Sequence, residues 1–238
     1  MGYLEQFLFG LYPYVCVVVF VMATAYRFER NPYSWQASSS QMMRKSNFAW
    51  ASNLFHVGIL AIAGGHVAGL LVPAEIYHLM RVPDDAHQKM ELVMGSIFGT
   101  AALVGLLVLT YRRVIDRRVR LTSAPSDLWI SLLLLLALVL GMLTLGPSFE
   151  TRDEGVYLHK LSHWAQLIVT LRPTEALGYL VGVPLVFKVH MVAGMTVFLV
   201  FPFTRLVHVC SAPVGYLVRS YYQIVRAPQP HGRAKERT

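Results

Sequence analysis

The stretch HVGILAIAGGH, His56 to His66, places two histidines in a run of residues that is otherwise apolar. An imidazole is costly in hydrocarbon unless something binds it, so polar residues inside membrane spans are functional candidates by default. The fold of this chain therefore depends on what holds these two rings.

The composition as a whole is that of an integral membrane protein. The 238 residues are 55% hydrophobic and 14% charged, whereas a soluble domain carries about 25% charged residues. A shorter amphipathic stretch, 156–171, is expected as a helix at the membrane interface. We expect an all-α membrane domain over 1–210 and a basic cytoplasmic tail over 211–238. Five runs approach or exceed the roughly 20 apolar residues that a membrane-crossing helix needs, and they lie near residues 3–26, 48–72, 88–111, 126–147 and 183–206.

Charge and cysteine usage narrow the function further. Most Lys and Arg residues outside the spans follow the first, third and fifth runs, so the positive-inside rule places the N-terminus outside and the C-terminus in the cytoplasm. The basic residues behind the net charge of +8 are thus concentrated in the segments on one side of the membrane. This distribution gives no indication of a nucleic-acid partner. Cys16 and Cys210 lie in or beside different runs, which predicts neither a disulfide framework nor a zinc site. The N-terminus, MGYLEQ, has no basic region, so the first run is expected to be a retained span.

Two more histidines, His190 and His208, lie in or beside the fifth run. If the second and fifth spans are antiparallel neighbours, His66 pairs with His190 at the outer level. His56 then pairs with His208 at the inner level. Two facing imidazoles at each level predict two six-coordinate haem sites, and such ligation suits electron transfer because it leaves no open position for oxygen chemistry.

Straight helices do not satisfy both pairs. Ten helical residues rise about 15 Å and eighteen about 27 Å, so the two spacings differ by about 12 Å. At about 100° per residue, His190 and His208 share a helix face, while the two histidines of the second span lie about 80° apart. Tilted helices, inclined haem planes or a bend near Pro202 would reconcile the pairs.

Small and polar neighbours of the histidines favour the same hypothesis. Gly69 and Gly194 lie one helical turn after the outer histidines, where a missing side chain would let a flat macrocycle approach the backbone. Ser52 and Thr204 lie four residues before the inner histidines, and their hydroxyls or backbone carbonyls are candidates to hold the other ring nitrogen. Ordinary helix packing by small residues is the alternative interpretation of the glycines.

Three arginines are candidate partners of haem propionates: Arg205, which is one turn from an inner histidine, and Arg112 or Arg113 at the end of the third run. The alternative is that these side chains extend towards the membrane surface.

The remaining histidines carry less information. His159 and His163 have the i, i+4 spacing that can chelate a metal on a helix, but on an amphipathic segment such residues more often belong to the polar face. His78, His87 and His231 are predicted in loops or the tail, with no partner visible in the sequence.

A family resemblance runs in order along nearly the whole chain. Its motifs are YPY (12–14), SSQM (39–42), ASNLFHVGIL (51–60), GGH (64–66), QKM (88–90), GMTVFLVFPFTRLVH (194–208) and APVGYLVR (212–219). With these motifs the sequence resembles the gamma subunit, a dihaem cytochrome b, of the bacterial membrane-bound respiratory nitrate reductase.

The resemblance implies five spans with two haems b held between helices 2 and 5. His56 and His208 would bind the proximal haem, which is nearer the partner subunits, and His66 and His190 the distal one. It further implies a quinol site beside the distal haem, which by motif falls on Gly65, His66 and Lys89.

The implied activity is quinol oxidation in the bacterial inner (cytoplasmic) membrane. Ubiquinol or menaquinol would be oxidised near the periplasmic face with release of protons there. Electrons would pass through the distal and then the proximal haem to an iron–sulfur beta subunit and a molybdenum catalytic alpha subunit, so the nitrate-reducing site would not be on this chain. Two alternatives stay open: a dihaem anchor of another reductase, such as a sulfur-metabolising one, and a non-enzymatic membrane anchor or transporter.

Overall fold

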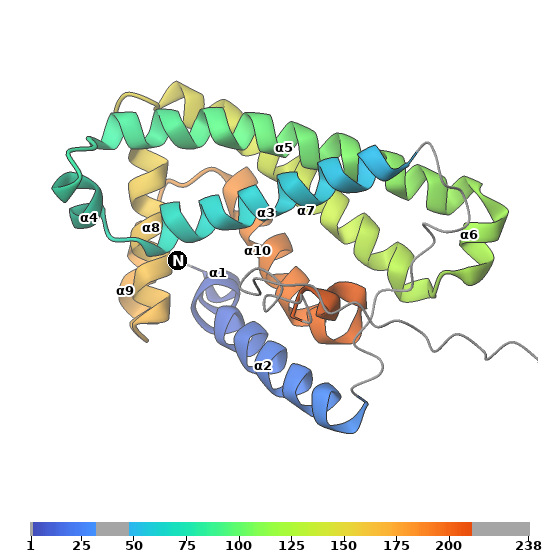
Figure 1. The fold of residues 1–238 in the computed structure, drawn as a ribbon. Helices are drawn as coiled ribbons and strands as arrows, with labels where there is room; N and C mark the ends of the chain where they lie inside the picture. The colour runs from blue at the N-terminus through green and yellow to red at the C-terminus, as the bar shows by residue number, and fades with distance from the viewer. Residues whose placement is uncertain (1, 32–47, 211–238) are drawn as a thin grey trace, which may run out of the picture.

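Five long helices dominate the fold (Figure 1), as the hydrophobic runs predict. The computed structural model describes residues 2–31 and 48–210, and the helices below lie in those ranges. An all-helical protein with enough spans for a multi-pass membrane protein is thereby confirmed. The five helices that are long and apolar enough to cross a membrane are Tyr3–Arg30, Ala49–Leu71, Asp85–Ile115, Pro125–Glu150 and Leu185–Phe203.

The long helices pack in a fixed order. Helix α5 (Asp84–Ile115) lies between α3 (Ala49–Leu71) and α7 (Pro125–Glu150), while α10 (Leu185–Val200) packs against α7 and α2 (Tyr12–Arg30). Helices α3 and α10 carry three of the four paired histidines, and each packs mainly against other helices. The histidines can therefore face one another across a space instead of a tight helix contact.

Two glycines set the close approach of α3 to α5. A Cβ atom added at Gly58 would lie 2.7 Å from the backbone nitrogen of Ala102, and one at Gly105 would lie 2.6 Å from that of Phe55. Backbone atoms cannot swing aside, so neither position accepts a side chain without separating the helices. Small residues commonly allow such approach between membrane helices, and here they fix the position of α3.

A second group of helices lies across one end of the bundle. In Figure 1, α8 (Val156–Val169) runs roughly perpendicular to α5, and it packs against α3. The amphipathic stretch is thus a helix, as predicted. It forms an apolar core with α9 (Pro173–Tyr179) and the N-terminal segment η1 (Phe7–Leu11). Within that core the indole nitrogen of Trp164 donates a hydrogen bond to the carbonyl of Phe9 at 3.2 Å.

Polar contacts tie the first span to α10. Lys188 Nζ lies 2.6 Å from Glu5 Oε1, in the first turn of the short helix α1 (Tyr3–Gln6). Further along, the hydroxyls of Tyr12 and Thr196 lie 2.9 Å apart. Both contacts flank the middle of α10 and hold it against the first span.

The fifth span breaks near Pro202, one of the three arrangements that would reconcile the histidine spacings. The α-helix ends at Val200 and a single 3-10 turn, η4 (Phe201–Phe203), follows. Thr204 is extended (φ −120°, ψ −179°) and precedes a second 3-10 segment, η5 (Arg205–Val209). A proline lacks the amide hydrogen needed to continue a helix. The two histidines of this span therefore do not lie on one continuous helix, and the shared helix face calculated for an unbroken helix does not apply.

The backbone groups exposed by this break find a partner on another helix. The guanidinium of Arg27, near the end of α2, donates to the carbonyl of Pro202 at 2.6 Å and to that of Thr204 at 3.0 Å. Hydrogen bonds from a charged group are stronger than neutral ones, so Arg27 stabilises the broken conformation.

Two short helices connect the spans: α4 (Ala74–Leu79) between α3 and α5, and α6 (Arg117–Thr122) between α5 and α7. The Asp116 carboxylate accepts a hydrogen bond from the Arg118 amide and caps α6. Neither helix was predicted from the sequence, because segments this short lack a recognisable hydrophobic period.

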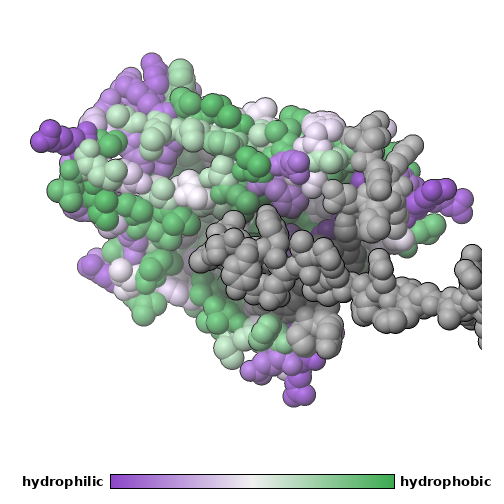
Figure 2. Space-filling view, viewed as in Figure 1, coloured by the Kyte–Doolittle hydropathy of each residue, from purple (hydrophilic) through white to green (hydrophobic). Residues whose placement is uncertain are grey.

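The surface is consistent with burial of the spans in lipid. Figure 2 shows hydrophobic residues over much of the described face, with strongly hydrophilic ones mainly towards its ends. On α3, the apolar residues Val57, Leu60 and Val67 are each more than half exposed (61%, 63% and 56%). In a bilayer these side chains contact lipid instead of water.

Candidate functional site

Four histidines meet in two pairs, as the antiparallel arrangement predicts. The rings of His66 on α3 and His190 on α10 have centroids 6.0 Å apart. Those of His56 on α3 and His208 on η5 have centroids 6.4 Å apart. The two pairs therefore lie at two levels along α3.

The separation within each pair suits a shared metal ion. Two imidazoles that bind one ion from opposite sides have ring centres about 6.2 Å apart, because a metal–nitrogen bond is about 2.0 Å and a ring nitrogen lies about 1.1 Å from the ring centre. Both observed separations, 6.0 and 6.4 Å, are close to this value. A direct hydrogen bond or stacking would bring the rings closer.

All four histidines hold the Nδ1 atom against a backbone carbonyl. A carbonyl only accepts hydrogen bonds, so we assign the ring proton to Nδ1 and the lone pair to Nε2. Metal-binding histidines are commonly fixed in this way by the second ring nitrogen. The acceptors are the carbonyls of Ser52 for His56 (2.7 Å), Ile62 for His66 (2.8 Å), Ala137 for His190 (3.1 Å) and Arg205 for His208 (2.6 Å).

These contacts confirm one of the two predicted ring-orienting residues. The carbonyl of Ser52 holds its histidine as expected, with the hydroxyl further away at 3.4 Å. The prediction for Thr204 was wrong, because the backbone is extended there and the next residue supplies the carbonyl. The Thr204 hydroxyl instead accepts a hydrogen bond from the Leu206 amide at 3.3 Å and caps η5.

There is open space beside the paired rings. His56 and His66 are exposed although they lie within an apolar span. At Gly65 and Gly194, no atom of the described residues outside the helix's own backbone lies within 4 Å of where a Cβ would stand. Exposed imidazoles beside bare glycine backbone can accommodate a flat macrocycle between α3 and α10, so the residues present fit a haem.

Gly141 on α7 has a role that the sequence did not reveal. A Cβ atom at this position would lie 3.0 Å from Cε1 of His190. The same helix supplies the carbonyl of Ala137 to that ring. Helix α7 therefore sets the orientation of His190, and only the packing of α7 on α10 discloses this.

Arginines gather near the inner histidine pair. Asp127 Oδ2 lies 3.4 Å from Nη1 of Arg113 and 3.7 Å from Nη1 of Arg205. The guanidinium of Arg112 lies over the ring of Phe48 at 4.7 Å. One carboxylate therefore serves two arginines, and a positive charge remains near the inner pair for an anionic group such as a propionate.

Lys89 lies at the opposite end of α5. Its Nζ is 2.9 Å from Asp153 Oδ1 and 3.2 Å from Asp85 Oδ2, and its side chain is 46% exposed. The hydrogen bond from Lys89 lowers the pKa of Asp153. A lowered folded-state pKa means that this pair contributes stability above the ordinary pKa of aspartate and loses it as the pH falls through the lowered value.

A second polar group, made by Glu91, His87 and Tyr77, lies beside α3. A methyl group at Gly69 would overlap the carboxylate of Glu91, so the expectation that Gly69 leaves room for a macrocycle was wrong. His87 Nε2 lies 3.4 Å from Glu91 Oε1, and the ring of Tyr77 stacks on His87 at 3.8 Å. Sequence reasoning missed these residues because His87 was predicted in a loop without a partner.

His159 and His163 stack on each other. Their ring centroids are 4.0 Å apart, and the second ring also stacks on Tyr179 at 5.0 Å. In the described part of the chain, no group of three or more His, Cys, Asp or Glu side chains is arranged to hold a metal ion. In the described structure the two histidines therefore make ring-stacking contacts, within α8 and from α8 to Tyr179 on α9.

Comparison with known proteins identifies the family of this chain. The family described as "Nitrate reductase gamma subunit" matches residues 5–228. The chain is 45% identical over 225 residues to the "Respiratory nitrate reductase 2 gamma chain" of Escherichia coli (strain K12), covering 94% of this chain and 98% of that protein. It is 40% identical over 216 residues to the "Nitrate reductase gamma chain" of Bacillus subtilis (strain 168), covering 91% and 96%. The chain therefore belongs to the nitrate reductase gamma subunit family.

Proposed function

We propose that this chain is the quinol-oxidising cytochrome b subunit of a membrane-bound nitrate reductase complex in the bacterial inner membrane. Quinol would be oxidised near the periplasmic face, with protons released outside and electrons delivered to a cytoplasmic iron–sulfur subunit. The N-terminus would lie in the periplasm and the C-terminus in the cytoplasm.

The observation that carries this proposal is the geometry of the two histidine pairs. Each pair has the ring separation of two imidazoles on one metal ion, and each ring has its Nδ1 atom fixed by a carbonyl. His56 and His208 would hold the proximal haem b, and His66 and His190 the distal one. Haem with two histidine ligands supplies one-electron transfer without an open position for oxygen.

The surrounding residues would complete the two haem sites. Arg205 and Arg112, near the inner pair, are the proposed partners of propionate groups, because a guanidinium can bind a carboxylate through two parallel hydrogen bonds. The Asp127 carboxylate already pairs with both Arg205 and Arg113. A propionate that binds Arg205 would therefore lie beside this group of three charged side chains.

The proposed quinol site lies at the outer level and includes Gly65, His66 and Lys89. The bare backbone at Gly65 leaves space beside the outer histidine pair. Lys89 supplies a cation held in place by Asp85 and Asp153, and its ammonium can donate a hydrogen bond to a quinol oxygen.

The proposed partners are an iron–sulfur beta subunit and a molybdenum catalytic alpha subunit. The membrane domain, 1–210, would anchor them, and the basic tail, 211–238, would dock on them from the cytoplasmic side. The tail lies outside the described residues, so its composition alone, basic and aromatic (GYLVRSYYQIVRAP), supports this part of the proposal.

A spectroscopic experiment on the purified chain tests the proposal. A reduced-minus-oxidised spectrum should show two haems b, and ubiquinol or menaquinol analogues should reduce them. A chain without haem would instead be a non-enzymatic anchor or transporter. Identification of the co-purifying subunits then distinguishes a nitrate reductase from another reductase, such as a sulfur-metabolising one, that uses a dihaem anchor.

A further inference from the structure

We infer that Glu91, His87 and the small cavity beside them form a path that carries protons from the proposed quinol site to the outer surface. The inference rests on the proposed function and adds to it the residues that accept the protons. It does not use Lys89, whose two aspartate partners make a separate group.

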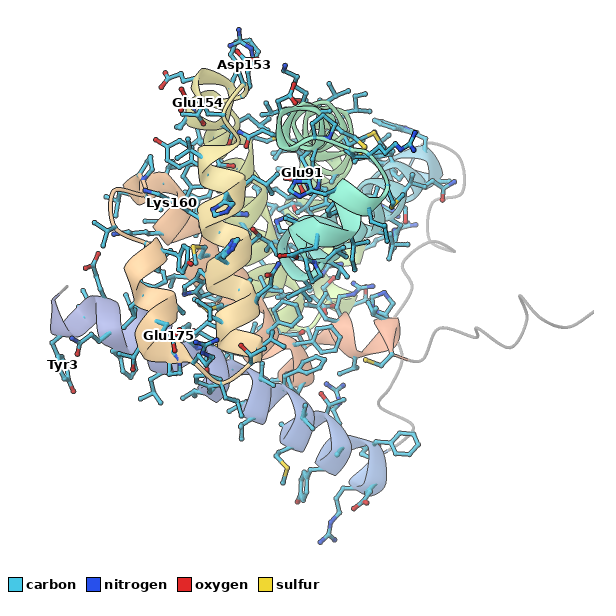
Figure 3. The ribbon with its side chains drawn as sticks, turned by 90° about the vertical axis from the view of Figure 1, so that its left-hand side faces the viewer. Tyr3, Glu91, Asp153, Glu154, Lys160 and Glu175 are labelled. Carbon is cyan, nitrogen blue, oxygen red and sulfur yellow. The ribbon has the colours of Figure 1, made fainter. Side chains whose placement is uncertain are left out.

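Glu91 is the first member of the path because it lies against α3, the helix that carries His66 of the outer pair. Its carboxylate occupies the space where Gly69 lacks a side chain, one helical turn beyond His66. In Figure 3 Glu91 lies among the helices, whereas Asp153 and Glu154 lie at the edge of the molecule. A carboxylate inside an apolar span is costly, and here it borders the level at which quinol would release protons.

His87 is the second member. It is 6% exposed, and its Nε2 lies 3.4 Å from Glu91 Oε1, one turn earlier on α5. An imidazole can accept a proton at one nitrogen and release one from the other. His87 can therefore take a proton from Glu91 and pass it towards the cavity that His87 also lines.

The cavity leads from His87 towards α8. It has a volume of about 20 Å³, which is enough for a water molecule and too small for a quinol. Its polar lining comes from three elements: Tyr77 on α4, His87 on α5, and His159 and Ser162 on α8. A buried water needs two to four polar partners, and this lining provides them.

The titratable groups around the path suit proton transfer outwards. Burial and the negative charge of Glu91 raise the pKa of Tyr77, so this phenol stays neutral and acts as a hydrogen-bond partner. On α8, His159 lines the cavity, is exposed and stacks on His163, which is partly buried. Among the described residues, α3 contributes Gly69 to the lining and its C-cap residue Val72 follows, and neither side chain titrates. The charged neighbours Lys89, Asp85 and Asp153 pair with one another.

The chemistry balances without a further reactant. Oxidation of one quinol releases two protons and two electrons, and the electrons leave one at a time to the acceptor that the outer histidine pair would hold. As a quinol O–H bond breaks, the Glu91 carboxylate gains that proton and becomes a carboxylic acid. It then gives the proton to His87, which passes it through cavity water to the surface, and Glu91 is a carboxylate again for the second proton.

The test compares Glu91→Gln with Glu154→Gln, a control that removes an exposed carboxylate from the same end of the molecule. Glutamine is close to glutamate in size but cannot accept a proton from quinol. In the purified complex we expect the haem absorption spectra of both variants to match that of the wild type. Haem reduction by quinol should slow at least tenfold in Glu91→Gln only, and Glu91→Asp should recover part of the rate.

A second measurement does not depend on turnover. Infrared difference spectra should show a carboxylic acid band that titrates in the wild type and in Glu154→Gln and is missing in Glu91→Gln. His87→Phe should slow quinol oxidation and shift its pH profile while the band remains.

The outcomes separate the two claims. If quinol does not reduce the haems of the wild-type complex, the proposed function fails, while the infrared titration still reports whether Glu91 exchanges protons. The proton path alone would be overturned if quinol reduced the haems of Glu91→Gln as fast as those of the wild type. It would also be overturned if the carboxylic acid band were unchanged in Glu91→Gln.

Discussion

The rings of His56 and His208 face each other at 6.4 Å because the fifth span does not continue as a helix to its end. The α-helix stops at Val200, and the extended residue Thr204 redirects the chain into η5. Arg27 stabilises this break from α2. A continuous helix would separate the two histidines of the fifth span by about 27 Å along its axis, too far for both to face histidines that lie about 15 Å apart on α3.

Single substitutions of the four histidines should remove one haem at a time. We expect His66→Ala and His190→Ala to lose the distal haem, and His56→Ala and His208→Ala to lose chiefly the proximal one, because each pair would share one iron. Redox titration of the haem spectrum in the four variants measures this. Loss of the same haem in the His56 and His190 variants would show that the pairing is wrong.

Gly141→Val should remove the distal haem without replacing any ligand. A Cβ atom at this position lies 3.0 Å from Cε1 of His190, and the larger valine side chain would displace that ring. The matched control is Gly146→Val on the same helix, where no described atom beyond the helix's own backbone lies within 4 Å of the added Cβ. We expect an altered haem spectrum in the first variant only, and two intact haems in Gly141→Val would contradict this role.

Gly58→Leu should separate α3 from α5. Overpacking a tight contact typically costs about 1–3 kcal/mol, and here the obstructing atoms are backbone atoms of Ala102. Because Gly58 is only two residues from His56, we expect a lower temperature of haem loss and a weakened proximal site. Thermal melts followed by haem absorbance test this, with Gly178→Ala, a position with open space, as the control.

Lys89→Ala should abolish or greatly weaken quinol oxidation while both haems still assemble, if Lys89 binds a quinol oxygen as proposed. Nitrate reduction driven by an artificial donor that acts on the cytoplasmic subunits should survive. Asp153→Asn is the informative companion, because it removes one of the two carboxylates that hold the ammonium and leaves the cation in place. Normal quinol turnover in Lys89→Ala would limit Lys89 to its two ion pairs.

Truncation after Cys210 should release the soluble subunits from the membrane, because the basic tail is proposed to dock on them. Membrane fractionation followed by assay of artificial-donor nitrate reduction in each fraction measures this. The competing role for a basic aromatic segment is adsorption to anionic lipid. Subunits that stay bound with full activity after truncation would favour that role.

The amino-acid sequence by itself determined the five long apolar helices and which histidines pair. Both depend on local properties: the length of an apolar run sets whether a helix can cross the bilayer, and alternating span direction sets which histidines share a level. The amphipathic helix α8 and the bend near Pro202 were anticipated on the same grounds.

Only the tertiary structure decided how the histidines are held and what surrounds them. The contact of Gly141 with His190, the bond from His190 to the Ala137 carbonyl and the contact of Glu91 with Gly69 each join two different helices. Such contacts depend on the rotation and tilt of one packed helix relative to another. An apolar run has the same hydrophobic length at any rotation about its axis, so its sequence alone does not specify which residues meet across the interface.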